Sequence, residues 1–193
     1  ITSGPHVGHF LGLLKNGAGL GVTHLEYAFQ EKPDGGIADA LSLAEHFAAG
    51  ESIAVILGDN TTDADISLQV QHFKKGALIY LKHVADPQRF GVPVFDKHDS
   101  AKIIAIEEKP KEPKSNFAVT GMYLYDKKVF DYIRELNPSP RGQLEITDVN
   151  NKYINANMMR WAELHGYWSD AGTFESLFET NAYWAQKLGI NNL

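Results

Sequence analysis

The sequence predicts a single α/β domain. Its clearest sign is the apolar run Ile53–Leu57, which ends abruptly at Gly58-Asp59-Asn60 and is typical of a strand buried on both faces of a sheet. Before it, apolar residues alternate over 23–30 and then repeat at helical spacing over 37–50, so the order is strand, helix, strand. The 193 residues, 44% of them hydrophobic, are enough for one core. We therefore expect a right-handed crossover unit with parallel strands.

The remaining segments continue the alternation of helices and strands. Val7, Leu11 and Leu14 predict an N-terminal helix that Asn16-Gly17 ends. Further strands are expected over 77–81, 92–95, 103–106 and 119–125. Further helices are expected over 66–75, after Asp126, around 146–153, and from Thr173 onward, the last with an apolar stripe that includes Phe174, Leu177 and Phe178. No repeat or low-complexity linker divides the chain, so residues 1–193 are predicted to form one domain.

The composition excludes several classes of protein. The net charge is −6, and the 18 Lys and Arg residues are scattered, which argues against a nucleic-acid partner or an anionic membrane surface. The chain has no Cys, so it has no disulfide framework or thiolate chemistry, which suits a cytoplasmic protein. No apolar stretch approaches the length of a membrane span. The first residue is Ile1 rather than Met, which indicates a fragment, a processed chain or an incomplete record.

Asp59 is the first candidate site residue. In open α/β sheets, ligands bind just beyond the carboxyl ends of the strands, where the predicted strand 53–57 places this carboxylate. Gly-Asp-Asn is also common turn composition, so a turn residue remains the alternative. A second carboxylate, Asp170, comes directly before the last helix, where it could instead be a helix cap. Two Asp residues without a Cys or His cluster suit a hard cation such as Mg²⁺ that bridges phosphates.

Three other segments carry groups that bind anions or hydroxyls. Asp34-Gly35-Gly36 precedes a helix and could bring backbone N–H groups close to a ligand, although a simple glycine turn is the alternative. Glu107-Glu108-Lys109 places carboxylates beside an ammonium at the end of a strand, and a solvated charge run is the alternative there. Arg141 lies in a turn, where it could bind a phosphate or simply be exposed.

Taken together and in order, these segments resemble the sugar-1-phosphate nucleotidyltransferases, and most closely the short glucose-1-phosphate thymidylyltransferases. The resemblance extends over nearly the whole chain. It rests on residues 2–5 with 8–10, 27–40, 55–60, 86–87 with 90–92, 106–110, 113–116, 118–123, 141–148 and 168–173. The fold that it implies is a doubly wound mixed sheet flanked by helices, with a sugar-binding half grown on the nucleotide-binding half.

The resemblance also implies residue roles. For the nucleotide it implies that Gln30 reads the pyrimidine base, that Gly36 contacts the base through its backbone, and that Asp59 and Asp170 hold Mg²⁺. For the sugar phosphate it implies hexose contacts from Gly91, Val119 and Glu108, and phosphate contacts from the catalytic pair Lys109 and Arg141.

The implied reaction joins a nucleoside triphosphate, dTTP being expected, to a hexose-1-phosphate, glucose-1-phosphate being expected, and releases pyrophosphate. The sugar phosphate attacks in line, so catalysis needs positioning and charge neutralisation rather than a nucleophilic side chain. The family's N-terminal first strand and glycine-rich phosphate loop, with its Arg and Lys, are not in this sequence. A non-catalytic nucleotide-sugar-binding module, or an inactive fragment with a regulatory or assembly role, is therefore the alternative. We also expect a homo-oligomer, because a sheet without that strand would expose an edge.

Overall fold

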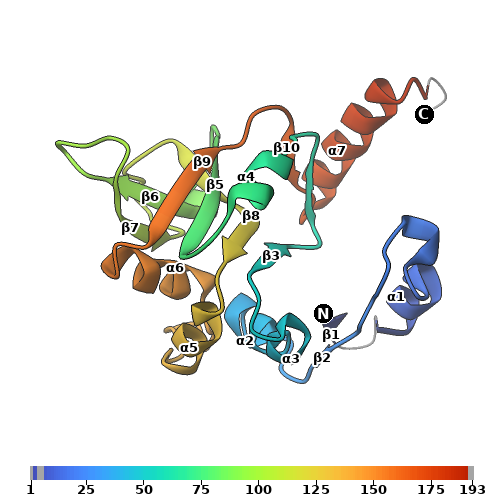
Figure 1. Cartoon of the computed structure of the whole chain (residues 1–193). Coiled ribbons are helices and arrows are strands. Elements are labelled where there is room, and N and C mark those ends of the chain that lie inside the picture. Colours follow the sequence, from blue (N-terminus) through green and yellow to red (C-terminus); the bar gives the residue numbers. More distant parts are fainter. Residues whose placement is uncertain (1, 4–6, 191–193) are drawn as a thin grey trace.

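A four-stranded mixed sheet forms the centre of the computed structural model, which describes residues 2–3 and 7–190; Gly4 and Pro5 of the N-terminal motif lie outside the described residues. The strand order is β3 (Ile53–Ile56), β8 (Phe117–Tyr125), β5 (Ala77–His83) and β9 (Met159–Glu163). β8 is antiparallel to both of its neighbours, whereas β5 and β9 are parallel. Helices lie around this sheet (Figure 1), so the predicted class of a mixed sheet flanked by helices is confirmed.

The two middle strands, β5 and β8, divide the core into two parts. Their side chains are buried almost throughout, as expected for strands covered on both faces. Alternate residues point to opposite faces of the sheet, so Ile79 and Tyr125 join the larger cluster, whereas Tyr80 and Leu124 join the smaller one. The larger cluster packs against α5 (Lys128–Arg134) and α6 (Ile146–Asn155), where the Tyr125 ring stacks on Tyr153 at a centroid distance of 5.6 Å.

Three pairs of strands and several short helices surround the central sheet. β6 (Gly91–Phe95) and β7 (Ile103–Glu108) are antiparallel, as are β4 (Asn60–Thr62) and β10 (Trp168–Asp170), whereas β1 (Thr2–Ser3) and β2 (Phe29–Gln30) are parallel. The other helices are α1 (Val7–Leu14), α2 (Ile37–Ser42), α3 (Glu45–Ala48), α4 (Ser67–His72), α7 (Phe174–Lys187) and the 3-10 turns η2 (Ala18–Leu20) and η3 (Pro87–Arg89). Over the described ranges, no helix is long and apolar enough to cross a membrane.

The strand that leads to Asp59 differs from its prediction in two ways. Its side chains alternate between half-buried and exposed, and Ile56 is 59% exposed, so β3 is not buried on both faces. It also forms no parallel pair with β2, because β3 pairs with β8 and β2 pairs with β1. The apolar run did predict a strand, but the burial and pairing of a strand depend on distant segments that local sequence does not specify.

Other boundaries also differ from the prediction. Only Phe29–Gln30 of the segment 23–30 is a strand, and the segment 37–50 forms two helices, α2 and α3, with a break between them. The strands β4, β9 and β10 were not predicted. Each of them pairs with a distant part of the chain, and β4 and β10 have only three residues, too few to show a period of two.

The last helix begins as predicted but packs differently. The Thr173 hydroxyl accepts a hydrogen bond from the backbone N–H of Ser176 at 3.1 Å and so caps α7. The predicted apolar stripe does not lie against the core, since Phe174 is 95% exposed and Phe178 is 74% exposed. Figure 1 shows both α7 and α1 projecting from the body of the molecule.

Gly76 provides a test of the fold at the start of β5. Its φ is +81°, and a Cβ atom there would overlap the carbonyl oxygen of Met158. Gly76→Ala should therefore lower the free energy of unfolding by about 2–4 kcal/mol, measured by urea denaturation. Gly12→Ala is the matched control, because the space around Gly12 is open and Ala favours a helix. An unchanged midpoint for Gly76→Ala would contradict this close packing.

Candidate active site

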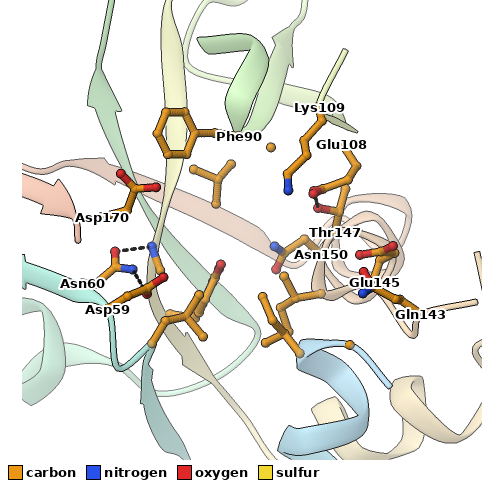
Figure 2. Close-up of a pocket in the computed structure, with 18 of the residues that line it drawn as sticks. Asp59, Asn60, Phe90, Glu108, Lys109, Gln143, Glu145, Thr147, Asn150 and Asp170 are labelled. Carbon is orange, nitrogen blue, oxygen red and sulfur yellow. Dashed lines mark hydrogen bonds between the residues drawn. The ribbon is translucent and has the colours of Figure 1, made fainter. Parts of the chain in front are cut away.

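One cavity of about 490 Å³ brings together all nine residues that the sequence singled out. It is lined by the middle of β8, the segment after β3, the start of β6 and the ends of β7 and β10 (Figure 2). A volume of this order is typical of small-molecule sites. The predicted residues along it are Gln30, Gly36, Asp59, Gly91, Glu108, Lys109, Val119, Arg141 and Asp170. The structure thus brings these residues together, although their roles remain predictions.

The two aspartates form the acidic end of the cavity. Asp170 ends β10 directly opposite Asn60 of β4, and Asp59 precedes Asn60. Both carboxylates line the cavity, close enough for the charge of Asp59 to act on Asp170. The Asp59 carboxylate accepts a hydrogen bond from Asn60 Nδ2 at 2.9 Å, and its carbonyl accepts one from the Ala171 N–H at 2.7 Å. Asp59 is therefore held from both strands.

Asn60 anchors this acidic end to the central sheet. Its Oδ1 accepts hydrogen bonds from the backbone N–H of Gly121 at 2.9 Å and from Trp168 Nε1 at 2.7 Å. The sequence reasoning did not assign Asn60 a role, although the residue is part of the Gly-Asp-Asn motif. The sequence feature that could have indicated a role for Asn60 is its position, a polar residue next to a candidate carboxylate at the end of a predicted strand.

The electrostatics of Asp170 fit a cation site. Burial raises the pKa of the Asp170 carboxyl, and the nearby Asp59 charge raises it further, whereas Arg89 opposes the shift. Two adjacent carboxylates offer the oxygen ligands that Mg²⁺ prefers. In the part of the chain that the structure describes, no cluster of three or more Asp, Glu, His or Cys residues surrounds a common point. The pair therefore fits an ion that takes its other ligands from phosphates and water, as Mg²⁺ commonly does.

The other end of the cavity combines carboxylates with cations. Glu108 accepts a hydrogen bond from the Thr147 hydroxyl at 2.6 Å, and a Cβ at Gly91 would lie 3.6 Å from the Glu108 carboxylate. Arg141 donates from Nη2 to both carboxylate oxygens of Glu145, at 2.9 and 3.0 Å, and to Glu108 at 3.4 Å. No residue within the described ranges accepts a hydrogen bond from Arg141 Nη1, which leaves this group for a ligand.

Lys109 lies in an uncommon backbone conformation at this end. Its φ is +46°, in the left-handed region that non-glycine residues seldom adopt, and its N–H donates to the Phe90 carbonyl at 3.0 Å. Figure 2 shows its side chain directed into the cavity beside Glu108. Residues held in such conformations often cluster at functional sites, where the surrounding structure maintains them.

Gln30 and Gly36 lie at the third side of the cavity and have structural roles of their own. The Gln30 amide donates to Asp39 at 2.8 Å and to the Gly36 carbonyl at 3.1 Å. Gly36 has a φ of +92°, and a Cβ there would overlap the Leu144 carbonyl. The close approach of these two backbones explains the glycine without a ligand, so a contact to a base stays a prediction.

Several residues that line the cavity were not predicted from the sequence, because their roles depend on contacts with residues elsewhere in the chain. Glu145 fixes Arg141, Thr147 fixes Glu108, and Tyr123 lies buried between the two ends. Burial raises the pKa of Tyr123, and the charges of Glu108 and Asp59 raise it further, so the phenol stays neutral. Arg141 and Glu145 are four residues apart, and this spacing of opposite charges is the one local signal that could have indicated a pair.

The chain belongs to the nucleotidyl transferase family, whose family model matches residues 1–187. Among its relatives, a glucose-1-phosphate thymidylyltransferase from Xanthomonas campestris pv. campestris (strain B100) is 43% identical over 186 residues, which cover 93% of this chain and 62% of the relative. The enzyme of the same name from Neisseria gonorrhoeae is 37% identical and is matched over 100% of this chain and 68% of its own length. The chain thus spans about two thirds of these relatives.

Solved structures agree with the fold. A protein from Bacillus anthracis that is assigned as a glucose-1-phosphate thymidylyltransferase, solved in complex with sucrose, superposes with a TM-score of 0.86 and 48% identity, covering 94% of this chain and 73% of that one. A UDP-glucose pyrophosphorylase in complex with UDP-glucose gives a TM-score of 0.75 at 21% identity, covering 93% of this chain and 73% of that one. The second likeness supports the fold alone.

The charge of Asp170 should make the free energy of unfolding depend on pH. Its raised pKa means that the folded chain binds a proton there more readily than the unfolded chain, so ionised Asp170 destabilises the fold as the pH rises through the folded-state pKa. Asp170→Asn should therefore raise the urea midpoint at pH 7, and the gain should vanish in acid, where both states are protonated. The exposed Glu112 gives the control Glu112→Gln, which should change stability by less than about 0.5 kcal/mol. A lower midpoint for Asp170→Asn at pH 7 would contradict the prediction.

Proposed function

We propose that this cavity is the substrate site of a nucleotidyltransferase that joins dTTP to glucose-1-phosphate and releases pyrophosphate. The observation that carries the proposal is the arrangement of the cavity, with an acidic pair at one end and Lys109, Arg141 and Glu108 at the other. Such a cavity can hold a sugar phosphate and a nucleotide phosphate side by side. The names of the relatives support the choice of dTTP and glucose-1-phosphate.

In the proposed reaction, a phosphate oxygen of glucose-1-phosphate attacks the α-phosphorus of dTTP. A new phosphorus–oxygen bond forms while the bond to the β-phosphate breaks, and pyrophosphate leaves with the electron pair. Lys109 and Arg141 hold the attacking phosphate and offset its charge, so no covalent intermediate on the protein is needed. Mg²⁺ bound at Asp59 and Asp170 would neutralise charge on the phosphates of the nucleotide.

The hexose would lie over Gly91, beside Glu108 and Val119. The Glu108 carboxylate accepts hydrogen bonds from sugar hydroxyls, and Thr147 fixes its orientation. Gly91 keeps the space beside this carboxylate open, because any side chain there would approach Glu108 and Thr147. Gln30 and Gly36, on the third side of the cavity, would contact the pyrimidine base.

A module that binds the nucleotide sugar without catalysis is the second candidate. The observation that favours it is that Lys109, Arg141 and Glu108 line the cavity, where they could hold a finished nucleotide sugar as well as its precursors. Reading the gene upstream of Ile1 for a glycine-rich segment with an Arg and a Lys, which the family uses on the triphosphate, would separate the two candidates. We also propose a cytoplasmic location, because dTTP, the substrate proposed for the first candidate, is a cytoplasmic metabolite.

Ligand binding tests the sugar-phosphate assignment with this chain. Titration with glucose-1-phosphate, followed by NMR or calorimetry, should show that Lys109→Ala weakens binding roughly tenfold to a hundredfold, as expected for the loss of a hydrogen bond between charged groups. Lys111→Ala is the matched control, because Lys111 is exposed and does not line the cavity. Equal affinities of Lys109→Ala and wild type would refute the assignment. Pyrophosphate release with dTTP and Mg²⁺ then distinguishes an enzyme from a binding module.

We further propose that the protein forms a homo-oligomer. Large apolar side chains are exposed on α7, including Phe174 and Phe178, and on α1, where Leu13 is 76% exposed. Exposed apolar side chains gathered on one helix are typical of contact surfaces. Light scattering should therefore give a multiple of the 21.4 kDa chain mass. Phe178→Ser should lower that mass, and a monomeric wild type would exclude the oligomer.

A further inference from the structure

Arg89 lies beside the acidic pair but is not among the predicted site residues. Its Nη1 donates to Asp86 at 2.9 Å, and its Nη2 donates to Asp170 at 3.3 Å. Arg89 also lines the cavity, and its hydrogen bond to Asp86, together with the charge of Asp170, raises the pKa of its guanidinium. Arg89 is thus a cation surrounded by acidic residues, and the proposed reaction gives it no role.

The two bonds of Arg89 differ in strength and in setting. The bond to Asp86 is the shorter, and these two residues span the 3-10 turn η3, where the N–H of Arg89 donates to the Asp86 carbonyl at 3.2 Å. The guanidinium carbon also lies 5.2 Å from the centre of the Phe90 ring. The bond to Asp170 is longer and joins segments far apart in the chain. The side chain is therefore anchored at Asp86, and the contact with Asp170 is the weaker one.

Asp170 is at the same time one of the two carboxylates suited to a divalent cation. In the described structure its Oδ2 accepts the hydrogen bond from Arg89, so a cation that approaches this oxygen competes with Arg89 for it. A divalent ion at Asp170 would also repel the positive guanidinium beside it. Both effects make the ion pair and the bound metal alternatives to each other.

We propose that Arg89 is a positioning residue that competes with the divalent cation for Asp170 and so sets the affinity of the metal site. The inference rests on the proposed metal-binding role of Asp59 and Asp170. Without the cation, Arg89 neutralises Asp170 and keeps its carboxylate turned into the cavity. When the cation binds, Arg89 gives up Asp170 and stays with Asp86 and the Phe90 ring.

Binding of Mn²⁺ alone, followed by electron paramagnetic resonance of the free ion, tests this competition without turnover. Arg89→Gln should bind Mn²⁺ about three- to tenfold more tightly than wild type, since it removes both the ion pair and the repulsion. Arg89→Lys keeps the charge but loses the forked geometry, so its affinity should fall between the two. A merely structural role would predict weaker binding in both variants, because the site would be disturbed.

Two further variants complete the experiment. Asp170→Asn should lose most of the Mn²⁺ affinity. Arg134→Gln is the matched control, because Arg134 pairs with Glu45 and Asp131 on the surface and does not line the cavity, so its affinity should equal that of wild type. Urea unfolding of each variant checks that it folds. If Arg89→Gln does not fold, the proposal is tested by Arg89→Lys, which should still bind Mn²⁺ more tightly than wild type.

The outcomes separate the two claims. Unchanged or weaker binding in the Arg89 variants, together with a loss in Asp170→Asn, would overturn the role of Arg89 and leave the metal site intact. If neither wild type nor Arg89→Gln shows binding that depends on Asp170, the metal site itself is wrong, and the competition is wrong with it.

Discussion

The side chain of Asn60 is the contact on which the arrangement of the site depends. Its Oδ1 accepts from Gly121 in the central strand β8 and from Trp168 in β10, and its Nδ2 donates to Asp59. A single amide therefore joins the central sheet to the pair β4 and β10. Gly121 must be a glycine for this contact, because a Cβ atom there would overlap the Asn60 side chain. The pairing of β4 with β10 and the bond from the Ala171 N–H to the Asp59 carbonyl hold Asp170 beside Asp59, 111 residues earlier in the chain, and the Asn60 side chain fixes this pair of strands to the central sheet.

At each end of the cavity an arginine offsets part of the carboxylate charge before any ligand binds. At one end Arg89 offsets Asp170, and at the other Arg141 offsets Glu145 and approaches Glu108. A ligand that carries both phosphates and a metal ion can take over these contacts, because it brings charge of each sign.

The sequence predicted the class of fold and most helices, because their apolar residues recur at local spacing. The cap of α7 followed from Thr173, and the apolar runs of β5 and β8 were recognised as strands. It did not predict that β3 pairs antiparallel with β8, or that β4 and β10 are strands, because these pairings join segments far apart in the chain. The apolar residues of α7 carried a helical period but no information on what covers them.

For the site, the sequence by itself determined which chemical groups are available and, through its resemblance to a family, where along the chain they lie. Asp59 and Lys109 were identifiable because each follows or ends a predicted strand, and Asp170 because it comes directly before the predicted last helix. Only the tertiary structure decided which groups meet and which are already engaged. The bonds from Arg89 to Asp170 and from Thr147 to Glu108 depend on where distant elements pack, because a hydrogen bond requires approach to within about 3 Å and sequence spacing fixes no such distance.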